Sequence, residues 1–592
     1  MKLADYLADF LSAEGVRHVF AIAGGASLHL IDSIGKHENI QLICPQHEQG
    51  AAMAADGYSR MSGNIGVAMV TSGPGATNLL TGVCSAYYDS VPLLLITGQV
   101  SRSRMKGGTG VRQIGFQETD TVEIFKPITK HAVQLTSASD IRYELEKCLH
   151  ISKSGRPGPV LLDIPDDLQR VYIDPNLLKS FTPLPRQNET NDFNALMAMI
   201  ANYIDLAERP VLILGAGIRL AKAEIELFKL IDKLGIPFVP TWAVADILPS
   251  THPLYIGTFG THGTRHANFA VQNADLIISV GSRLDTKATG SPISSFARGA
   301  KKVVVDIDIN ELNKFEAFGL KIDVAIEADA RFFLKNLNEI MAQPIENKLT
   351  VWLKQIADWR ERHPVGTGRA ISNNSVDPYY FVKALSDRSS ENELIVSDTG
   401  CTLAWMMQGF KFKANQRLFH DWNNTAMGWA VPASVGISLT SAGGQVVCVI
   451  GDGSLMMSIQ ELATIVRYRL PVKIFLFNNK GYAMIRQTQD QWLDSRYFAS
   501  SNSGGLASVN FMALAESFGF KCYNALCNED VRVVINTVMK SDEPTFCNVV
   551  IDENACVVPQ VKFGRPNEDS EPLLSREQFL KEMIVTPLDV SL

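Results

Sequence analysis

Apolar runs alternate with amphipathic stretches along most of the chain. In the first third, the runs 19–23, 67–71 and 93–97 predict buried parallel strands, each followed by a glycine-containing turn and then a helical pattern such as 77–88. Strands and helices that alternate in this way are typical of α/β folds, in which helices cover both faces of a parallel sheet. The pattern therefore predicts a doubly wound sheet in this region.

The same alternation recurs in two further parts of the chain. A second unit starts at 209–217, where an apolar run ends in a glycine turn, and continues through the runs 276–281 and 303–308. The apolar runs of a third unit lie at 394–397, 446–450, 472–477 and 548–551. The predicted fold class is α/β, with three doubly wound parallel-sheet domains. Sequence similarity between the units is too weak to define a repeat.

Stretches rich in proline or polar residues separate the three units. The first, 172–190, contains three prolines, and the second is the polar stretch 366–374. The end of the chain is acidic and again contains proline. We place the boundaries accordingly: an N-terminal domain at 1–172, a central domain at 190–345, a C-terminal domain at 375–555 and a tail at 556–592.

Composition and charge exclude several classes of protein. The chain has 592 residues, 46% apolar and 20% charged, which is enough core-forming material for several folded domains. A net charge of −7 without a basic stripe argues against nucleic acid as a partner. Asp5 and Asp9 interrupt any signal peptide, and no apolar run approaches the ~18 residues of a membrane span. The nine cysteines contain no C-x-x-C pair. We expect a cytoplasmic protein with reduced thiols and no membrane contact.

The most specific local signal is a Gly-Asp-Gly turn at the end of a predicted strand. This turn lies at 451–453, and Asn479 follows the next predicted strand. The carboxylate of Asp452, the amide oxygen of Asn479 and the backbone carbonyl of Gly481 can share one Mg²⁺ ion with a diphosphate. Alone, Gly-Asp-Gly is more often a simple tight turn, but the strand context and the second turn favour the metal site.

Together with further motifs, this spacing resembles that of thiamine diphosphate enzymes. The motifs are 47–58 (HEQGAAMAADGY), 71–78 (TSGPGATN), 96–99 (ITGQ), 116–118 (FQE) and 154–159 (SGRPGP). Their order resembles the acetohydroxyacid synthase family, the acetolactate synthase large subunits, over nearly the whole chain. The resemblance implies the thiamine diphosphate enzyme fold of the pyruvate oxidase and acetolactate synthase type.

Glu48 has the clearest predicted chemistry. Thiamine diphosphate reacts after its thiazolium C2 loses a proton to the cofactor's own 4′-imino group, and a carboxylate bonded to the pyrimidine N1′ favours that tautomer. The resemblance assigns this carboxylate to Glu48; the alternative is a helix-capping or surface glutamate. It also places Phe116 and Gln117 at the reacting carbons and Met427 under the bent cofactor, whereas a loop glutamine and a core methionine are the alternatives. Further implied cofactor contacts are Gly25, Gly400, Gly453 and Ser454.

The central unit resembles the FAD-binding set of the family. Glycine turns allow close approach to a pyrophosphate, an arginine can pair with it, and an acid at a strand end can accept ribose hydroxyls. The resemblance implies a non-redox FAD; the alternative is that these motifs only maintain the fold. The implied residues are Arg156, Gly215, Gly217, Gly260, His262, Gly263, Arg283, Asp306 and Asp308.

Several positions depart from the family pattern. Thr488 replaces a tryptophan of the second-substrate pocket, which predicts a larger pocket. An insertion before Phe116 contributes a loop that can contact phosphates, or that is only a solvated surface loop; its cations are Arg102, Arg104, Lys106 and Arg112. The sequence at 400–403 departs from the pattern expected for the diphosphate contacts. Lys287 and the sequence at 422–424 depart from the pattern expected for the flavin contacts.

The predicted activity is that of a thiamine diphosphate-dependent carboligase. Pyruvate is the expected donor and acetolactate or a related hydroxyketone the product, with Arg283 near the acceptor carboxylate. One alternative is a cross-carboligase that uses a bulkier ketone such as a nucleotide-linked keto-sugar. Another is a diketone hydrolase or a 2-ketoacid decarboxylase, although the chain lacks the paired histidines typical of decarboxylases. The resemblance also implies a homodimer or homotetramer.

Overall fold

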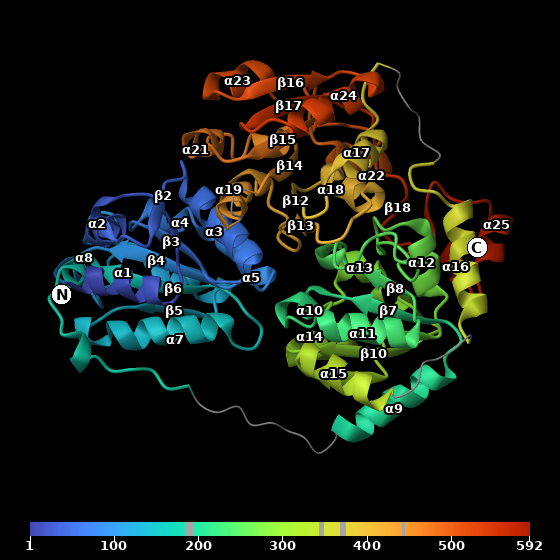
Figure 1. The fold of residues 1–592 in the computed structure, drawn as a ribbon, viewed down its shortest axis with the longest axis horizontal. Helices are drawn as coiled ribbons and strands as arrows, with labels where there is room; N and C mark the ends of the chain where they lie inside the picture. The colour runs from blue at the N-terminus through green and yellow to red at the C-terminus, as the bar shows by residue number, and fades with distance from the viewer. Residues whose placement is uncertain (184–192, 342–347, 368–373, 441–443) are drawn as a thin grey trace.

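The computed structural model describes residues 1–183, 193–341, 348–367, 374–440 and 444–592, and Figure 1 shows that they form three α/β units. The N-terminal unit has a six-stranded parallel sheet of order β2-β1-β3-β4-β6-β5. Its strands are β1 (His18–Ala21), β2 (Gln41–Ile43), β3 (Gly66–Val70), β4 (Leu93–Gln99), β5 (His131–Gln134) and β6 (Val160–Pro165). Its helices are α1 (Leu3–Ala13), α2 (Leu28–Lys36), α3 (Glu48–Ser62), α4 (Pro74–Thr77), α5 (Leu80–Tyr88), α6 (Thr121–Phe125), α7 (Ile141–Lys153) and α8 (Asp166–Gln169).

The central unit has a five-stranded parallel sheet of order β11-β10-β9-β7-β8. Its strands are β7 (Pro210–Leu214), β8 (Phe238–Pro240), β9 (Leu276–Val280), β10 (Lys301–Asp306) and β11 (Val324–Glu327). Its helices are α9 (Phe193–Leu206), α10 (Ala216–Leu220), α11 (Glu224–Leu234), α12 (Arg265–Gln272), α13 (Thr286–Thr289), α14 (Ile309–Asn313), α15 (Ala330–Ile340) and α16 (Thr350–Arg362).

The C-terminal unit repeats the strand order of the first, as β13-β12-β14-β15-β17-β16. Its strands are β12 (Leu394–Ser397), β13 (Arg417–Phe419), β14 (Val446–Gly451), β15 (Val472–Asn478), β16 (Lys521–Ala525) and β17 (Thr545–Val550). Its helices are α17 (Pro378–Arg388), α18 (Cys401–Gly409), α19 (Ala430–Thr440), α20 (Asp452–Leu455), α21 (Glu461–Arg467), α22 (Ala483–Trp492), α23 (Phe511–Phe518) and α24 (Asn528–Met539). The predicted three-sheet α/β architecture is confirmed.

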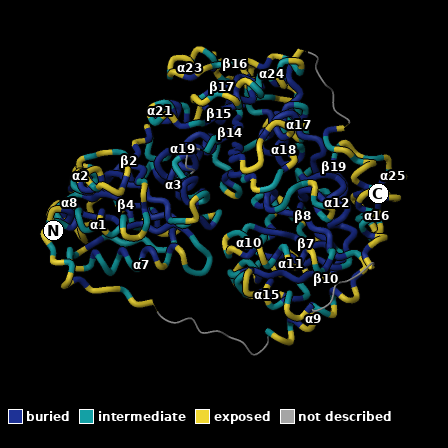
Figure 2. Tube along the Cα trace, viewed as in Figure 1, coloured by how far each residue is buried: buried dark blue, intermediate teal, exposed yellow. Residues whose placement is uncertain are grey.

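The central strands are buried as their apolar runs predict. Every residue of β3, β4 and β6 is buried, and Figure 2 shows buried segments through the middle of each unit. The predicted helix 77–88 is wrong in its bounds, because α4 ends at Thr77 and α5 starts at Leu80. The predicted boundaries at 190 and 345 lie outside the described residues. No helix in the described part of the chain has the length and apolar character needed to cross a bilayer.

The tail returns to the central unit and is more ordered than its acidic sequence suggests. It forms β18 (Gln560–Val561), β19 (Ser570–Glu571) and α25 (Arg576–Glu582), which lies beside α16 in Figure 1. Buried acids tie it down: Arg298 pairs with Glu568 at 2.7 Å, and the Trp359 indole donates to Glu582 at 2.8 Å. Charge-assisted bonds of this kind hold the tail against the central sheet.

The N-terminal and C-terminal units meet through α3 and α19, which lie side by side in Figure 1. Small residues allow the two backbones to touch. A Cβ atom at Gly57 would lie 2.5 Å from the Ala433 carbonyl oxygen, and one at Gly436 would lie 1.9 Å from that of Ala54. Both positions therefore require glycine for steric reasons.

We predict that Gly436→Ala destabilises the protein by about 2 kcal/mol or more, because the added methyl group forces the two backbones apart. Denaturant unfolding measures the change. Gly35→Ala on α2 is the matched control, since the added Cβ would meet no atom within 4 Å beyond its chain neighbours and the backbone of its own helix. It should be neutral or stabilising by up to about 1 kcal/mol. Equal stability of Gly436→Ala and the wild type would contradict the proposed contact.

Candidate active site

Glu48 is the first residue of α3. The preceding His47 caps the helix, and its ring accepts from the Gln49 amide. The Asn78 side chain donates to the Glu48 carboxylate at 2.9 Å. The carboxylate thus lies at the positive end of the helix dipole, and the hydrogen bond from Asn78 sets its direction. The half-buried acid is therefore oriented, not a freely rotating surface side chain.

One loop brings three predicted residues together. The turn after β3 places Gly75 so that an added Cβ would lie 3.6 Å from Glu48 Oε1, and Gly73 so that one would lie 3.0 Å from the Gln117 Cβ. Thr71 of the same loop accepts from the Ala26 amide at 3.2 Å, next to Gly25. Gln117 has a φ of 62°, a left-handed conformation that costs a non-glycine residue energy.

Asp452, Asn479 and Gly481 converge at the carboxyl ends of β14 and β15. The parallel register pairs Gly451 with Phe477, which puts the two following turns next to each other. Asp452 accepts from the Gly453 amide at 2.8 Å and from the Gly481 amide at 2.9 Å. Burial raises the pKa of Asp452 to about 6, and these hydrogen bonds oppose that rise.

The donor set in these turns fits a hard cation. Asn479 Oδ1 is buried and has no hydrogen-bond partner among the described residues, although a buried carbonyl normally has one. A carboxylate, an amide oxygen and a backbone carbonyl are oxygen ligands of the kind that Mg²⁺ binds together with phosphate. The residues present therefore fit the predicted metal.

The remaining thiamine-side positions surround this turn. Gly428, next to Met427, packs against it, since an added Cβ would lie 3.0 Å from the Ser454 carbonyl. The Gly428 and Ala430 amides donate to Asp398 at 3.2 and 2.9 Å. Gly400 has a φ of 78° and precedes α18, so the altered sequence at 400–403 still provides a helix N-terminus with free amides.

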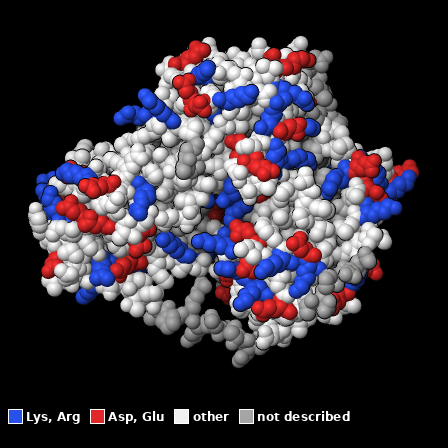
Figure 3. Space-filling view, in the orientation of Figure 1, with Lys and Arg blue, Asp and Glu red and all other residues white. Residues whose placement is uncertain are grey.

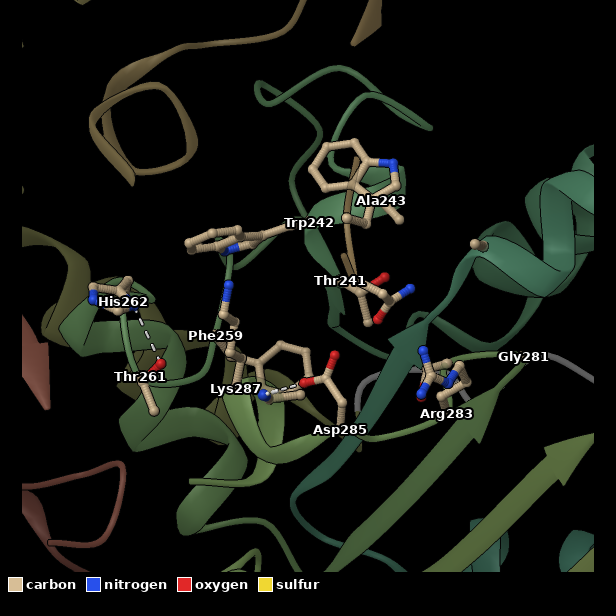
Figure 4. Close-up of a pocket in the computed structure, with 15 residues that line it drawn as sticks. Thr241, Trp242, Ala243, Phe259, Thr261, His262, Gly281, Arg283, Asp285 and Lys287 are labelled. Carbon is tan, nitrogen blue, oxygen red and sulfur yellow. Dashed lines mark hydrogen bonds between the residues drawn. The ribbon is translucent and has the colours of Figure 1, made fainter. Parts of the chain in front are cut away.

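The central unit contains a groove made of two adjoining cavities, of about 380 and 100 Å³. Both are lined by Ala216, Ala243, Gly281, Arg283, Trp422 and Asn423. The larger also contains Gly217, Arg156 and Asp306, and the smaller contains His262 (Figure 4). Basic side chains gather where the N-terminal and central units meet (Figure 3), in agreement with Lys153 and Lys222 on the wall of the larger cavity. The groove suits an elongated anionic ligand.

Two buried nitrogen atoms on the groove have no hydrogen-bond partner among the described residues. They are Arg283 Nη1 and His262 Nε2, and burial lowers the pKa of His262 to about 4, so its ring is neutral. Arg156 bridges Asp308 at 3.0 Å and Glu311 at 2.8 Å. Asp308 is thus engaged already, whereas Asp306 lines the cavity. The free Arg283 donor fits a nucleotide pyrophosphate such as that of FAD, and His262 Nε2 also donates in the tautomer whose Nδ1 accepts from Thr261.

The predicted glycines of the groove lie where a neighbouring backbone segment passes too close for a side chain. A Cβ at Gly215 would lie 2.1 Å from the Gly281 carbonyl oxygen, and one at Gly260 would lie 2.3 Å from that of Lys287. At Gly263 an added Cβ would meet the backbone of Phe259 at 2.4 Å. These residues shape the groove by allowing turns to pack closely.

The insertion before Phe116 is less cationic than its sequence suggests. Arg102 pairs with Asp167 at 2.8 Å and Lys106 with Asp120 at 2.6 Å. Within the described residues, Arg104 and Arg112 have no ion pair and are exposed. Phe116 itself is 87% exposed. Thr488 lies on α22, where its hydroxyl donates to the Met484 carbonyl at 3.0 Å.

Sequence reasoning missed several residues of the site. Asn78 lies within the motif 71–78, which does not by itself indicate a contact with Glu48, and Asp398 follows a predicted strand. Glu461 accepts from the Gln46 and His47 amides at 3.0 and 3.1 Å, just before Glu48. No local pattern marks Glu461, because its partners lie more than 400 residues away in the chain.

Comparison with known proteins defines the class. The chain matches the models of the thiamine pyrophosphate enzyme N-terminal TPP binding domain at 1–124, the central domain at 197–337 and the C-terminal TPP binding domain at 398–549. It is a thiamine pyrophosphate-dependent enzyme.

Full-length relatives define the family more closely. The chain is 34% identical to the acetolactate synthase isozyme 2 large subunit of Escherichia coli over 97% of this chain and 100% of the relative. It is 33% identical to the acetolactate synthase large subunit of Lactococcus lactis, over 94% of this chain and 93% of that protein. A probable acetolactate synthase large subunit of Methanocaldococcus jannaschii is 34% identical over 95% and 94%. The chain belongs to the acetolactate synthase large-subunit family.

We predict that Asn479→Ala weakens Mg²⁺-dependent binding of thiamine diphosphate by roughly tenfold or more, because it removes the unpartnered oxygen. Calorimetric titration with and without Mg²⁺ measures this effect. Asn478→Ala is the matched control, since the Asn478 side chain is already bonded to Asn548 at 3.0 Å. Equal affinities of the two variants would refute the metal assignment.

Proposed function

We propose that this enzyme decarboxylates pyruvate and joins the resulting two-carbon unit to a second pyruvate to form acetolactate. The observation that carries the proposal is the oriented Glu48 carboxylate at the N-terminus of α3, in a chain whose full-length relatives are acetolactate synthases. These relatives do not favour the diketone hydrolase, the decarboxylase or the cross-carboligase.

Glu48 is the residue to which we assign proton transfer at the pyrimidine ring of the cofactor. When bound, thiamine diphosphate supplies an acidic ring carbon that becomes a nucleophile toward keto groups. Glu48 accepts and returns a proton at the pyrimidine edge. Asn78 keeps the carboxylate in position, and Glu461 fixes the backbone immediately before it. The site therefore supplies an oriented proton carrier.

The other residues of the site would bind and orient the cofactor, its metal ion and the substrate. Asp452, Asn479 and the Gly481 carbonyl would hold Mg²⁺, and the amides at the start of α18 and α20 would receive the diphosphate. We assign to Met427 the support of the thiamine ring and to Gln117 a hydrogen bond to the substrate oxygen. The strained backbone of Gln117 is consistent with a fixed position for that donor.

We further propose that FAD occupies the groove of the central unit without a redox role, and that the active enzyme is at least a homodimer. Arg283 Nη1 and His262 Nε2 would pair with FAD, and Arg283 is also the residue that we expect near the acceptor carboxylate. Phe116, which is 87% exposed in one chain, would be covered by a second copy and would line its pocket.

Glu48→Gln should lower turnover by roughly 10²-fold or more, because an amide cannot carry the proton. The affinity for thiamine diphosphate should change little. Acetolactate formation and calorimetry measure the two quantities on the same preparation. Wild-type turnover in this variant would rule out the proton role, and loss of cofactor binding would make Glu48 a binding residue instead.

The acceptor pocket can be tested at Thr488. Thr488→Trp adds an indole to α22, so it should reduce products from ketones bulkier than pyruvate more strongly than it reduces acetolactate. Mass spectrometry of products from pyruvate paired with acceptors of increasing size measures the ratio. An unchanged ratio would show that Thr488 does not limit acceptor size.

A further inference from the structure

One segment, residues 421–428, connects the groove of the central unit to the thiamine side of the site. Near its start, Trp422 and Asn423 line both cavities of the groove. Near its end lies Met427, followed by Gly428 against the Gly-Asp-Gly turn. The segment belongs to the C-terminal unit, yet it forms a wall of a groove in the central unit.

Asp89, at the end of α5 in the N-terminal unit, grips the start of this segment. Its carboxylate accepts from the Trp422 amide at 2.8 Å, from the Asn423 amide at 3.0 Å and from the Asn423 side chain at 2.6 Å. The Asp89 side chain is 1% exposed. Three hydrogen bonds to one buried carboxylate fix both the position and the orientation of the backbone at Trp422 and Asn423.

Arg60, near the end of α3, holds Asp89 in turn. Its guanidinium pairs with Asp89 at 2.7 Å and with Asp56 at 2.8 Å, and it donates to the His420 carbonyl at 2.9 Å. A planar guanidinium with several donors at fixed angles can satisfy these acceptors together. The segment is thus tied to the helix whose other end carries Glu48.

Both ends of the segment are fixed. Asp421 accepts from Ser85 of the N-terminal unit at 2.8 Å and from the Ala426 amide at 2.8 Å. Asp398 accepts the Gly428 and Ala430 amides. Between them Thr425 is in a left-handed conformation, with a φ of 52°. A short segment held in this way has little freedom to move at one end alone.

We propose that Asp89 and Arg60 are positioning residues that couple the two cofactor sites through the segment 421–428. The FAD groove and the thiamine site, both taken from the function proposed above, require the same arrangement of this segment. A ligand in one site therefore pre-orders the wall of the other, and the coupling is reciprocal.

The test measures FAD affinity by flavin fluorescence on cofactor-depleted full-length enzyme, with and without saturating thiamine diphosphate and Mg²⁺. In the wild type the second cofactor should raise FAD affinity by a factor within roughly 5–150-fold. In Asp89→Asn the factor should fall close to one, because two of the three bonds to the segment are lost or weakened. A purely structural role for Asp89 would lower both affinities and leave the factor unchanged.

Asp275→Asn is the matched control. Asp275 also accepts two backbone amides, those of Glu208 and Arg209 at 2.8 and 2.9 Å, but it precedes β9, at the sheet end opposite the groove. This variant should keep the wild-type factor. If Asp89→Asn does not fold, Ser85→Ala removes a hydroxyl that donates to Asp421 at 2.8 Å and accepts from the Asn424 side chain at 3.3 Å. It should reduce the factor at least twofold.

The outcomes separate this inference from the proposed function. A wild-type factor of one, no FAD binding to the wild type, or an unchanged factor in Asp89→Asn and Ser85→Ala would each overturn the coupling. Acetolactate formation is assayed separately at saturating cofactors. An enzyme that shows the coupling but makes no acetolactate would overturn the proposed reaction and leave the coupling intact.

Discussion

The backbone contact between α3 and α19 is the constraint on which the rest of the site depends. Because Gly57 and Gly436 let the helices touch, no side chain separates α3 from α19 at these two points, and close packing fixes α3 relative to the C-terminal sheet. Glu48 lies at one end of α3 and Arg60 near the other. The segment 421–428 leads directly into α19. One helix pair therefore fixes both the carboxylate to which we assign proton transfer and the support of the segment.

Burying the charges at this junction costs free energy. Because each buried charge needs a close partner to offset that cost, only a few arrangements of these side chains are stable. Arg60 pairs with Asp56 and Asp89, and Asp421 is a third carboxylate close enough for its charge to stabilise the guanidinium. Burial, followed by the charge of Asp89, raises the pKa of Asp421 to about 7. Removing one partner from such a cluster is far more damaging than replacing the whole cluster with apolar residues. We infer that the main effect of the cluster is to favour one geometry of the junction, and that its contribution to stability is smaller.

Sequence reasoning succeeded where the signal is local. The runs of β3, β4 and β14 are buried almost throughout, and Asp452 and Asn479 follow adjacent strands, so strand register alone brings them together. Edge strands were missed: β5 is half-buried along its whole length, and β11 alternates between buried and exposed residues. The roles of Asp89 and Arg60 could not be predicted, since Trp422 and Asn423, which Asp89 holds, lie more than 330 residues away from it. Trp422 was recognised only as a departure from the family pattern.

The N-terminal and C-terminal sheets have equivalent strand orders. This equivalence explains why the contact between α3 and α19 positions the loops of both sheets. β1, β2 and β3 correspond to β12, β13 and β14, so α3, after β2, corresponds to α19, after β13. Gly25 and Gly400 follow corresponding strands, as do the loop 71–75 and the Gly-Asp-Gly turn. In each sheet these loops flank the point where strand order reverses, which is where α/β sheets bind ligands. The two units thus present equivalent edges, and the contact between equivalent helices holds these edges in a fixed relation. We assign proton transfer to the edge that carries Glu48 and diphosphate binding to the edge that carries Asp452.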